Sequence, residues 1–497
     1  MGAWRRNLER PDAMIPFADF APDRSDFDAT ASDTILNVIP QAESYGPFPA
    51  FVAITDALPA KPLGAILVPY AGSYVAFAGT VDKLYQLDTA NLDWDDVSQA
   101  MTTYAVPSGD AWSFVQYGDY VIAADKVDAT QKFNLAAPAT FVDLGGTPPK
   151  SKYLGVIGDF LQALNTEASE REDRWSGLNA PEQWTAGEQA SDAQQFPDGG
   201  PIMGFAGFER GGVIFQETCI REQALALDSP LIFTMQKTVS DKGCVAPRSI
   251  VNTGDGVFYL SQLGFCQYGL PPTRIGESRV DGFFLNDVDL SFLDQVQGIA
   301  DPNRNIVAWR YKSRAHVNEN TTDKVLIYNY SRSRWSIANV ELAWLVPAAS
   351  PGYTLESLDA LGFTLDTLPF SLDSRAWASG APVLGGFDAS YRLGFFSGAP
   401  MEAMLQTGDI EFNPGRRSFV SGWRPIIDGG TVSGRVAVKG THQAARTWLA
   451  EASSQTTGII PARAEGRLHR FELTIAAGGT WSHVHGVDAA PRQTGYR

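Results

Sequence analysis

The chain has 497 residues, 39 of them basic and 56 acidic, and a net charge of −17. Hydrophobic residues make up 44% of it and charged residues 19%, so the composition favours β-structure and buried contacts in two to four domains or one large repeat. Three cysteines without a CxxC pair exclude a disulfide-stapled framework, and no apolar run reaches the length of a membrane span. We therefore expect free thiols, synthesis in a reducing cytosol, no secretory leader and no membrane insertion.

Residues 1–64 are expected to form an extended N-terminal arm. Closely spaced prolines interrupt any helical pattern there. An arm that lies along another part of the protein fits this pattern better than an independent domain does. The prolines are Pro11, Pro16, Pro22, Pro40, Pro47, Pro49, Pro59 and Pro62.

A degenerate unit recurs through residues 65–345: a short apolar strand, a tight turn, a second alternating strand and a closing aromatic residue. YVAFAGTVDKLYQL followed by Trp94 is one copy, and YVIAADKVDATQKFNL followed by Phe141 is the next. The copies start about 40 to 50 residues apart, a period typical of the four-stranded blades of a β-propeller. We expect propeller blades here, with a β-sandwich whose hairpins imitate a repeat as the alternative.

Strand alternation is clearest in the first copy of this unit. Val75 and Phe77 are expected to point to one side of the strand, and Ala76 and Ala78 to the other. Stacked blades bury such faces between neighbours, and the closing aromatic residue can fill the wedge between two blades.

Residues 346–410 are expected to hold the last blade strands and an excursion with a strict local repeat, SLDALGF, TLDTLPF and SLDSRAW. The seven-residue spacing would suit a coiled coil, but Gly362 and Pro369 argue against a continuous helix. A looped excursion that gates a channel and an ordinary linker between blades both remain open. The candidate gate residues are Leu358, Asp359, Leu365, Asp366, Leu372 and Asp373.

Residues 411–497 are expected to form a C-terminal antiparallel β-domain that serves for docking. In RLHRFELTIAAGGTW, Phe471 and Leu473 alternate with Arg470 and Glu472, which predicts one buried and one solvated face. The segment holds 11 basic and 6 acidic residues, a net of +5, which leaves 28 basic and 50 acidic residues and a net of −22 for residues 1–410. A basic face for an acidic protein partner is the favoured interpretation over a phosphate-binding or merely solvated face. Its candidate residues are Arg416, Arg417, Arg424, Arg463, Arg467 and Arg470.

No motif for chemistry stands out. GxSxG, a phosphate-binding GxxxxGK[ST] loop, GxGxxG after a strand and HExxH are all missing. His483 and His485 are spaced to share a strand face but have no third ligand nearby in sequence, and the acidic cluster around Asp93 matches no calcium loop. We expect no enzyme, no catalytic residues, no metal and no cofactor, with a pair of carboxylates for glycan cleavage as the main enzymatic alternative.

Several segments resemble the tail nozzle proteins of short-tailed bacteriophages, also called tail hub or packaged-DNA stabilisation proteins. The resemblance runs from about Phe20 to Arg497. Its segments are FAPDRSDF, NVIPQAESYGPFPAF, DRWSGLNAPEQW, SLDALGFTLDTLPFSLDSRAW and RLHRFELTIAAGGTWSHVHGVDAAPRQTGYR.

The resemblance implies a structural virion protein: a β-propeller subunit of a hexameric ring that assembles in the host cytoplasm and becomes part of the viral tail. Such a ring extends the channel of the portal and adaptor proteins, retains packaged double-stranded DNA and releases it on ejection. It also anchors a tail needle, fibres or spikes. Acidic walls would let DNA slide without sequence-specific binding. A β-propeller that binds or cleaves glycans is the alternative function.

Overall fold

The computed structural model is almost entirely β-strand, and the chain divides into two compact units. The propeller unit comprises Ala50–Ser333 and Asn339–Gly398, and the terminal unit comprises Met1–Pro49, Arg334–Ala338 and Ala399–Arg497. The structure describes residues 14–226, 232–349 and 382–495. The helices in those ranges are η1 (Pro247–Ser249), α1 (Asp281–Asp287) and η2 (Leu290–Gln295).

Within the described residues, seven sets of four hydrogen-bonded strands follow one another through the propeller unit. In the first four sets, neighbouring strands run antiparallel in chain order. The first two are β8 (Ala65–Tyr70), β9 (Ser73–Gly79), β10 (Leu84–Asp88) and β11 (Asp93–Asp96), then β12 (Ser113–Tyr117), β13 (Tyr120–Ala124), β14 (Gln131–Asn134) and β15 (Val142–Asp143). The next two are β16 (Ser151–Ile157), β17 (Phe160–Thr166), β18 (Glu172–Trp175) and β19 (Asp192–Gln195), then β20 (Ile202–Phe208), β21 (Gly211–Gln216), β22 (Ile220–Leu225) and β23 (Phe233–Val239).

The last three sets complete the series, and the seventh takes its fourth strand from an earlier part of the chain. The fifth is β24 (Val251–Asn252), β25 (Val257–Ser261), β26 (Gly264–Gln267) and β27 (Thr273–Arg274). The sixth is β28 (Gln297–Asp301), β29 (Ile306–Tyr311), β30 (Thr322–Asn329) and β31 (Arg334–Leu342), whose residues Arg334–Ala338 belong to the terminal unit. The seventh is β32 (Trp344–Ala349), β33 (Pro382–Phe387), β34 (Arg392–Pro400) and β7 (Pro49–Ala57).

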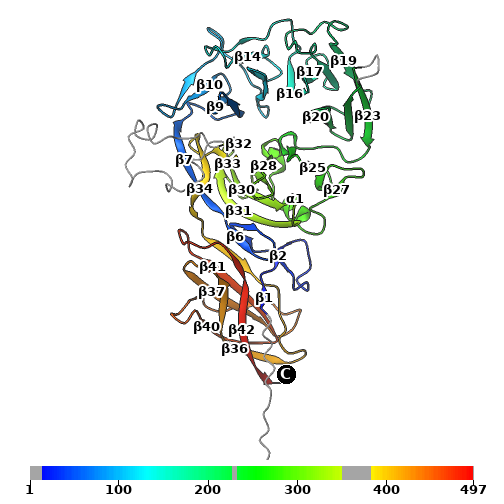
Figure 1. Cartoon of the computed structure of the whole chain (residues 1–497). Coiled ribbons are helices and arrows are strands. Elements are labelled where there is room, and N and C mark those ends of the chain that lie inside the picture. The colour runs from blue at the N-terminus through cyan, green and yellow to red at the C-terminus, as the bar shows by residue number, and fades with distance from the viewer. Residues whose placement is uncertain (1–13, 227–231, 350–381, 496–497) are drawn as a thin grey trace, which may run out of the picture. The chain divides into compact units, whose positions relative to one another are not determined.

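The first strands of successive sets lie side by side around a ring (Figure 1). β8 contacts β12, β12 contacts β16 and β16 contacts β20, while η1 contacts both β20 and β28. β28 contacts β32, which contacts β8 again. The fold is therefore a β-propeller, with seven blades among the described residues, and the expectation of a propeller is confirmed over the β-sandwich.

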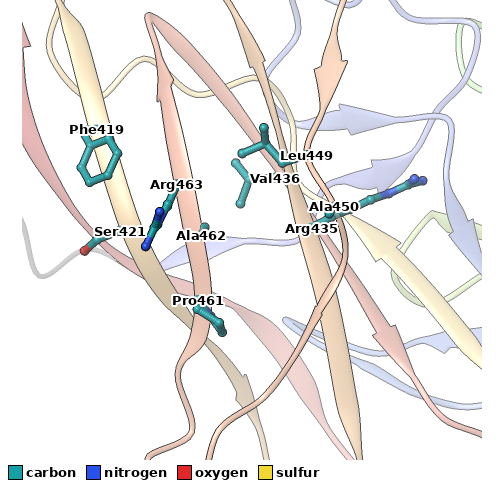
Figure 2. A pocket seen from close by; sticks show the side chains of 9 residues that line it. All are labelled: Phe419, Ser421, Arg435, Val436, Leu449, Ala450, Pro461, Ala462 and Arg463. Atoms are coloured by element: carbon teal, nitrogen blue, oxygen red, sulfur yellow. The ribbon is translucent and has the colours of Figure 1, made fainter.

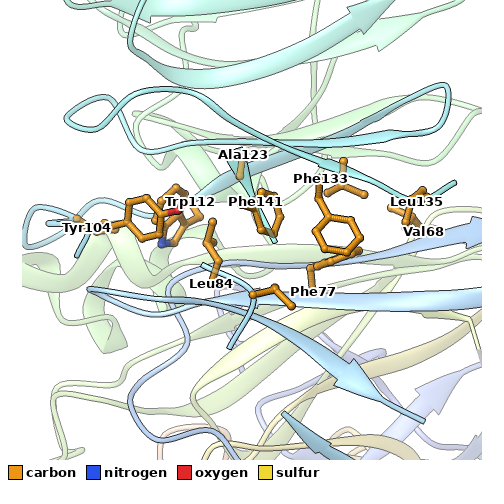
Figure 3. Close-up of a cluster of buried hydrophobic side chains, with 12 residues drawn as sticks. Val68, Phe77, Leu84, Tyr104, Trp112, Ala123, Phe133, Leu135 and Phe141 are labelled. Carbon is orange, nitrogen blue, oxygen red and sulfur yellow. The ribbon is translucent and has the colours of Figure 1, made fainter. Parts of the chain in front are cut away.

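Large side chains fill the space between the first two blades (Figure 3). Phe77 of β9 packs edge-on against Phe133 of β14, with ring centroids 4.9 Å apart, and against Phe141 at 5.7 Å. On the other side of β9, Ala76 and Ala78 pack in a second cluster with Trp94 and with residues of the seventh blade. The predicted alternation is confirmed, as is the wedge role of the closing aromatic residues.

The predicted N-terminal arm contributes to both units. Its residues 50–57 lie in β7, the outer strand of the seventh blade, so a strand that precedes β8 in the chain closes the ring. Its earlier strands belong to the terminal unit: β1 (Ile15–Pro16), β2 (Asp19–Phe20), β3 (Ala31–Ser32), β4 (Ile35–Leu36), β5 (Val38–Pro40) and β6 (Tyr45–Pro47).

Among the described residues of the terminal unit, two larger sheets pack on each other through Trp423 and Phe471, whose rings lie 5.4 Å apart, and β2 and β3 form a separate parallel pair. One sheet has the order β40-β36-β42-β6-β5 with β1 also paired to β42, and the other runs β4-β35-β41-β37-β38 with β39 also paired to β37. The strands not yet named are β35 (Ala403–Gln406), β36 (Arg417–Ile427), β37 (Val432–Lys439), β38 (Thr447–Trp448), β39 (Ala452–Ser453), β40 (Ile460–Gly466), β41 (Leu468–Ile475) and β42 (Val484–Gly495).

The prediction that one face of β41 is solvated is wrong. Phe471 and Leu473 are buried as predicted, but Arg470 and Glu472 on the opposite face are only 2% and 3% exposed. Side chains from other segments cover that face and pair with its charges, which a period-two pattern does not reveal.

Candidate functional site

The six arginines of the predicted docking face do not form one surface. Arg470 is buried, and its Nε lies 2.8 Å from Oδ1 of Asp409, so it is not available to a partner. Arg467 is half-buried and pairs with Glu411 at 2.6 Å. These two assignments are corrected, because both guanidinium groups neutralise carboxylates of their own unit.

The remaining arginines are more accessible. Arg417, Arg424 and Arg463 are exposed and Arg416 is half-buried. Arg463 of β40 lines a groove of about 490 Å³, beside Phe419 of β36 (Figure 2). The other lining residues are Ser421, Arg435, Val436, Leu449, Ala450, Pro461 and Ala462.

The basic C-terminal segment is neutralised within its own unit. The terminal unit holds 16 basic and 16 acidic residues, and the remaining 23 of 39 basic and 40 of 56 acidic residues belong to the propeller unit. The N-terminal arm supplies the balancing charge through ion pairs, such as Asp19 with Arg334 at 2.7 Å and Asp26 with Arg446 at 2.9 Å. The whole net charge of −17 is therefore that of the propeller unit.

The leucine-aspartate repeat lies outside the described residues. The candidate gate residues Leu358, Asp359, Leu365, Asp366, Leu372 and Asp373 all fall between residues 350 and 381. Their role as a gate stays a prediction.

The propeller unit has a pocket of about 380 Å³ near the first strands of several blades. It is lined from several blades: Ser113 begins β12, Tyr153 lies in β16, Met203 in β20 and Trp344 in β32. A site built from several blades around the ring is where a propeller can hold a ligand. The other lining residues are Gly109, Ala111, Trp112, Lys152, Val245, Pro247, Arg248 and Asp294.

Two guanidinium groups lie against the indole of Trp344 in this part of the propeller. Cζ of Arg248 is 5.2 Å and Cζ of Arg310 is 5.3 Å from the ring centroid, a favourable distance for cation-π contact. Arg248 donates to the carbonyl oxygens of Gly109, at 2.8 Å, and Asp294. We call Arg248, Arg310 and Trp344 the arginine cluster.

Arg310 of β29 is held in place by amide groups. Its Nε donates to Oε1 of Gln297 at 2.8 Å, and Gln297 in turn bonds both the N–H and the carbonyl oxygen of Leu345. Burial and the nearby charge of Arg248 lower the pKa of Arg310 to about 9, although Asp294 opposes this shift. A lowered arginine pKa marks a place where positive charge is poorly compensated.

Two buried carboxyl groups also have shifted pKa values, but neither lines this pocket. Burial raises the pKa of Asp173 to about 8 and that of Asp125 to about 6. Asp125 accepts bonds from the backbone N–H groups of Val127 and Asp128, which makes it part of a turn. Neither group has the pocket position of a catalytic acid.

The histidines and acidic clusters show no metal geometry. The rings of His483 and His485 stack 6.1 Å apart, and Nδ1 of His483 lies 3.2 Å from the hydroxyl of Ser44. Over residues 14–226, 232–349 and 382–495, His, Cys, Asp and Glu form no group of three that could hold a metal ion. In the same ranges, no helix is long and apolar enough to cross a bilayer.

No protein-family model matches the chain, and no curated protein matches it. Among solved structures, it is similar at 9% identity to the β-propeller domain of Cps50 (Swd1) from Myceliophteria thermophila, with a TM-score of 0.41 over 69% of this chain and 99% of that one. It is also similar at 9% identity to the extracellular domain of BT4673 from B. thetaiotaomicron, with a TM-score of 0.43 over 81% of this chain and 47% of that one. A third similar structure is PorZ, a surface component of the type-IX secretion system of Porphyromonas gingivalis, at 10% identity and a TM-score of 0.33 over 60% of this chain and 35% of PorZ. The matched parts thus span about half of the BT4673 domain and about a third of PorZ.

Proposed function

We propose that this chain is a structural subunit of the tail nozzle of a short-tailed bacteriophage. Six copies form a ring that extends the channel of the portal and adaptor proteins, retains the packaged DNA and lets it pass on ejection. The ring assembles in the host cytoplasm and carries the needle, fibres or spikes of the tail. The subunit acts through its interfaces and carries out no reaction.

One observation carries this proposal. The segments that resemble nozzle proteins lie near both ends of the chain, yet they fold into the same unit. FAPDRSDF, most of NVIPQAESYGPFPAF and the final RLHRFELTIAAGGTWSHVHGVDAAPRQTGYR all belong to the terminal unit. They pair directly there: Tyr45 of β6 lies opposite Val484 of β42. These segments are more than 400 residues apart in the chain but share one unit, which supports a resemblance of the whole architecture rather than of isolated sequence motifs.

The internal segment DRWSGLNAPEQW has a structural role in the third blade. The hydroxyl of Ser176 accepts a 3.0 Å bond from the N–H of Leu161, and the indole N–H of Trp175 donates to Ala190 at 2.9 Å. Arg174 donates to the carbonyl oxygen of Trp184 at 2.6 Å. These residues hold the loop in shape, which is consistent with a scaffold role.

The charge distribution supports a DNA conduit. The propeller unit carries the whole net charge of −17, and the terminal unit is neutral. An acidic surface repels DNA phosphate, so DNA that passes such a surface is not trapped. Partners then dock on surfaces other than a uniformly basic face. Among the six candidate arginines, Arg424 and Arg463 are exposed, and Arg417 is exposed but lies 3.7 Å from Glu465.

Native mass measurement of the purified chain, alone and with portal and adaptor proteins, tests the proposal. We expect closed rings of six subunits, either free or on the adaptor, and no retention on double-stranded DNA at physiological salt. A chain that stays monomeric with both partners would contradict the proposal.

The pocket favours one second candidate, a glycan-binding or glycan-cleaving propeller, because Trp112, Tyr153 and Trp344 supply aromatic surface. Turnover of a glycan by the purified chain, lost on changing one acidic pair, would favour that function instead.

A further inference from the structure

The pocket of the propeller unit contains more positive than negative charge. Lys152 and Arg248 line it, together with the carboxylate of Asp294. Lys152 forms an ion pair with Asp110. Arg248 is only 18% exposed, and its Nη1 lies 3.8 Å from Oδ2 of Asp294, the outer limit of an ion pair.

Two further cations interact with residues that line this pocket. Arg310 is 2% exposed, and it donates to the neutral acceptors Gln297 and Leu342. Among the described residues, no carboxylate lies within 4 Å of it. Lys61 is half-buried, and the charges of Arg310, Asp294 and Arg248 all act on it. The four cations Lys61, Lys152, Arg248 and Arg310 thus face two carboxylates, those of Asp110 and Asp294.

Such an excess is unfavourable unless a counter-charge is present, because buried cations lose hydration that only an anion or good acceptors replace. The two guanidinium groups share one aromatic neighbour, since Cζ of each lies within 5.3 Å of the centroid of the Trp344 ring. Arginine is also the side chain best suited to oxyanions, which it binds with several N–H groups at once.

We propose that this pocket binds an oxyanion with two negative charges, of the phosphate class, either free or carried on a small molecule. Arg248 and Lys152 contact the anion, while Arg310 and Lys61 add their positive charge. The volume of about 380 Å³ leaves room for a ring beside the anion. The inference goes beyond the proposed function, since a ring subunit needs no small ligand, and it holds for the single chain whether or not rings form.

Calorimetric titration of the full chain tests this site. The ligands are inorganic phosphate, glucose 6-phosphate and glucuronate, with glucose as the neutral control, all at constant ionic strength. We expect saturable 1:1 binding of the two phosphates, weaker binding of glucuronate and no detectable binding of glucose. Equal affinity for phosphate and glucose 6-phosphate identifies the free ion as sufficient, and tighter binding of glucose 6-phosphate assigns the remaining volume to a ring.

Two substitutions with opposite expected effects on phosphate affinity keep the test independent of folding defects. Arg248→Ala should weaken phosphate binding at least tenfold, whereas Asp294→Asn should strengthen it severalfold, which a damaged fold does not produce. Lys83→Ala, at a surface lysine paired with Asp96 in the first blade, is the matched control and should change nothing. No saturable phosphate binding, or binding that neither Arg248→Ala nor Asp294→Asn alters, would overturn the proposal.

Discussion

Asp19 and Arg334 are 315 positions apart in the chain, yet Nε of Arg334 lies 2.7 Å from Oδ1 of Asp19. The same guanidinium group covers the ring of Tyr45 at 4.4 Å and donates to the carbonyl oxygen of Gln41 at 2.9 Å. One arginine thus fastens three parts of the N-terminal arm within the terminal unit, which explains how a proline-rich segment becomes ordered.

Removing this arginine should release the arm. We expect Arg334→Ala to lower the free energy of unfolding of the terminal unit by about 2 kcal/mol, because several carbonyl oxygens and the carboxylate of Asp19, which is 33% exposed, lose their donor. Chemical denaturation combined with limited proteolysis of residues 14–48 measures this. Arg332→Ala, at an exposed arginine two positions earlier, should leave both readouts unchanged. Equal effects of the two substitutions would contradict the role of Arg334.

Asp409 forms ion pairs with three cations of the terminal unit. Lys439 lies 2.8 Å from it, Arg470 also 2.8 Å and Arg446 3.3 Å. Asp409→Asn removes the carboxylate from Lys439 and Arg470, while Arg446 keeps Asp26 as a partner, and should cost about 3 to 5 kcal/mol. Asp488→Asn, at an exposed position of β42, is the control and should cost less than about 0.5 kcal/mol.

The same carboxylate predicts acid sensitivity. Burial raises the pKa of Asp409, but the bond from Lys439 and the charges of Arg470 and Arg446 outweigh this and hold it below its ordinary value. A lowered folded-state pKa gives stability that is present above the unfolded pKa, near 4, and lost as the pH falls through the folded value. Denaturation at pH 6 and pH 3 should therefore show a loss in the wild type that is smaller in Asp409→Asn.

Gly394 of β34 allows β7 to close the propeller. A Cβ atom there would lie 2.1 Å from the carbonyl oxygen of Val52 and 2.7 Å from Cα of Ala53, both backbone atoms of β7. Gly394→Ala should therefore destabilise the propeller unit by about 2 kcal/mol or more. Gly440→Ala, where a Cβ meets nothing within 4 Å, serves as the control in thermal unfolding. A propeller transition that stays at the wild-type temperature in Gly394→Ala would refute this closure.

Asp173 should make the propeller unit less stable in alkali. Its folded-state pKa of about 8 exceeds the ordinary value of 3.8, so the folded state binds the proton more tightly. The stability this gives is fully present below pH 4 and is lost progressively as the pH rises toward and through 8, on the order of 5 kcal/mol at about 1.4 kcal/mol per unit of pKa. Urea denaturation from pH 5 to pH 9 should show this slope in the wild type and in Asp192→Asn, an exposed neighbour in the third blade, but not in Asp173→Asn. Persistence of the slope in Asp173→Asn would assign it to another group.

Local patterns predicted the blades well and long-range pairing poorly. The alternation of Phe77 with Ala76 is a property of adjacent residues, so strand faces could be assigned before any fold was known. Burial of Arg470 depends on Asp409, which is 61 residues away, and no local pattern connects the two. The use of residues 50–57 as the outer strand of the last blade likewise depends on β34, far along the chain.

The candidate site was also predicted poorly wherever it depends on residues far apart in the chain. Summing charge along the chain gave a basic end, whereas the folded terminal unit adds the acidic arm and becomes neutral. The arginine cluster was missed because Arg248, Arg310 and Trp344 come from three different elements. The excess of apolar and aromatic residues in the blades was the only signal near it, and that pattern also describes an ordinary core.

Deletion of this coding sequence from a short-tailed phage that carries it tests the central claim most directly. Packaged DNA per particle is the quantity to measure, before and after purified chain is added back. We expect heads that fill and then lose their DNA, with retention restored by the added wild-type chain. Full, infectious particles that lack the chain would contradict it.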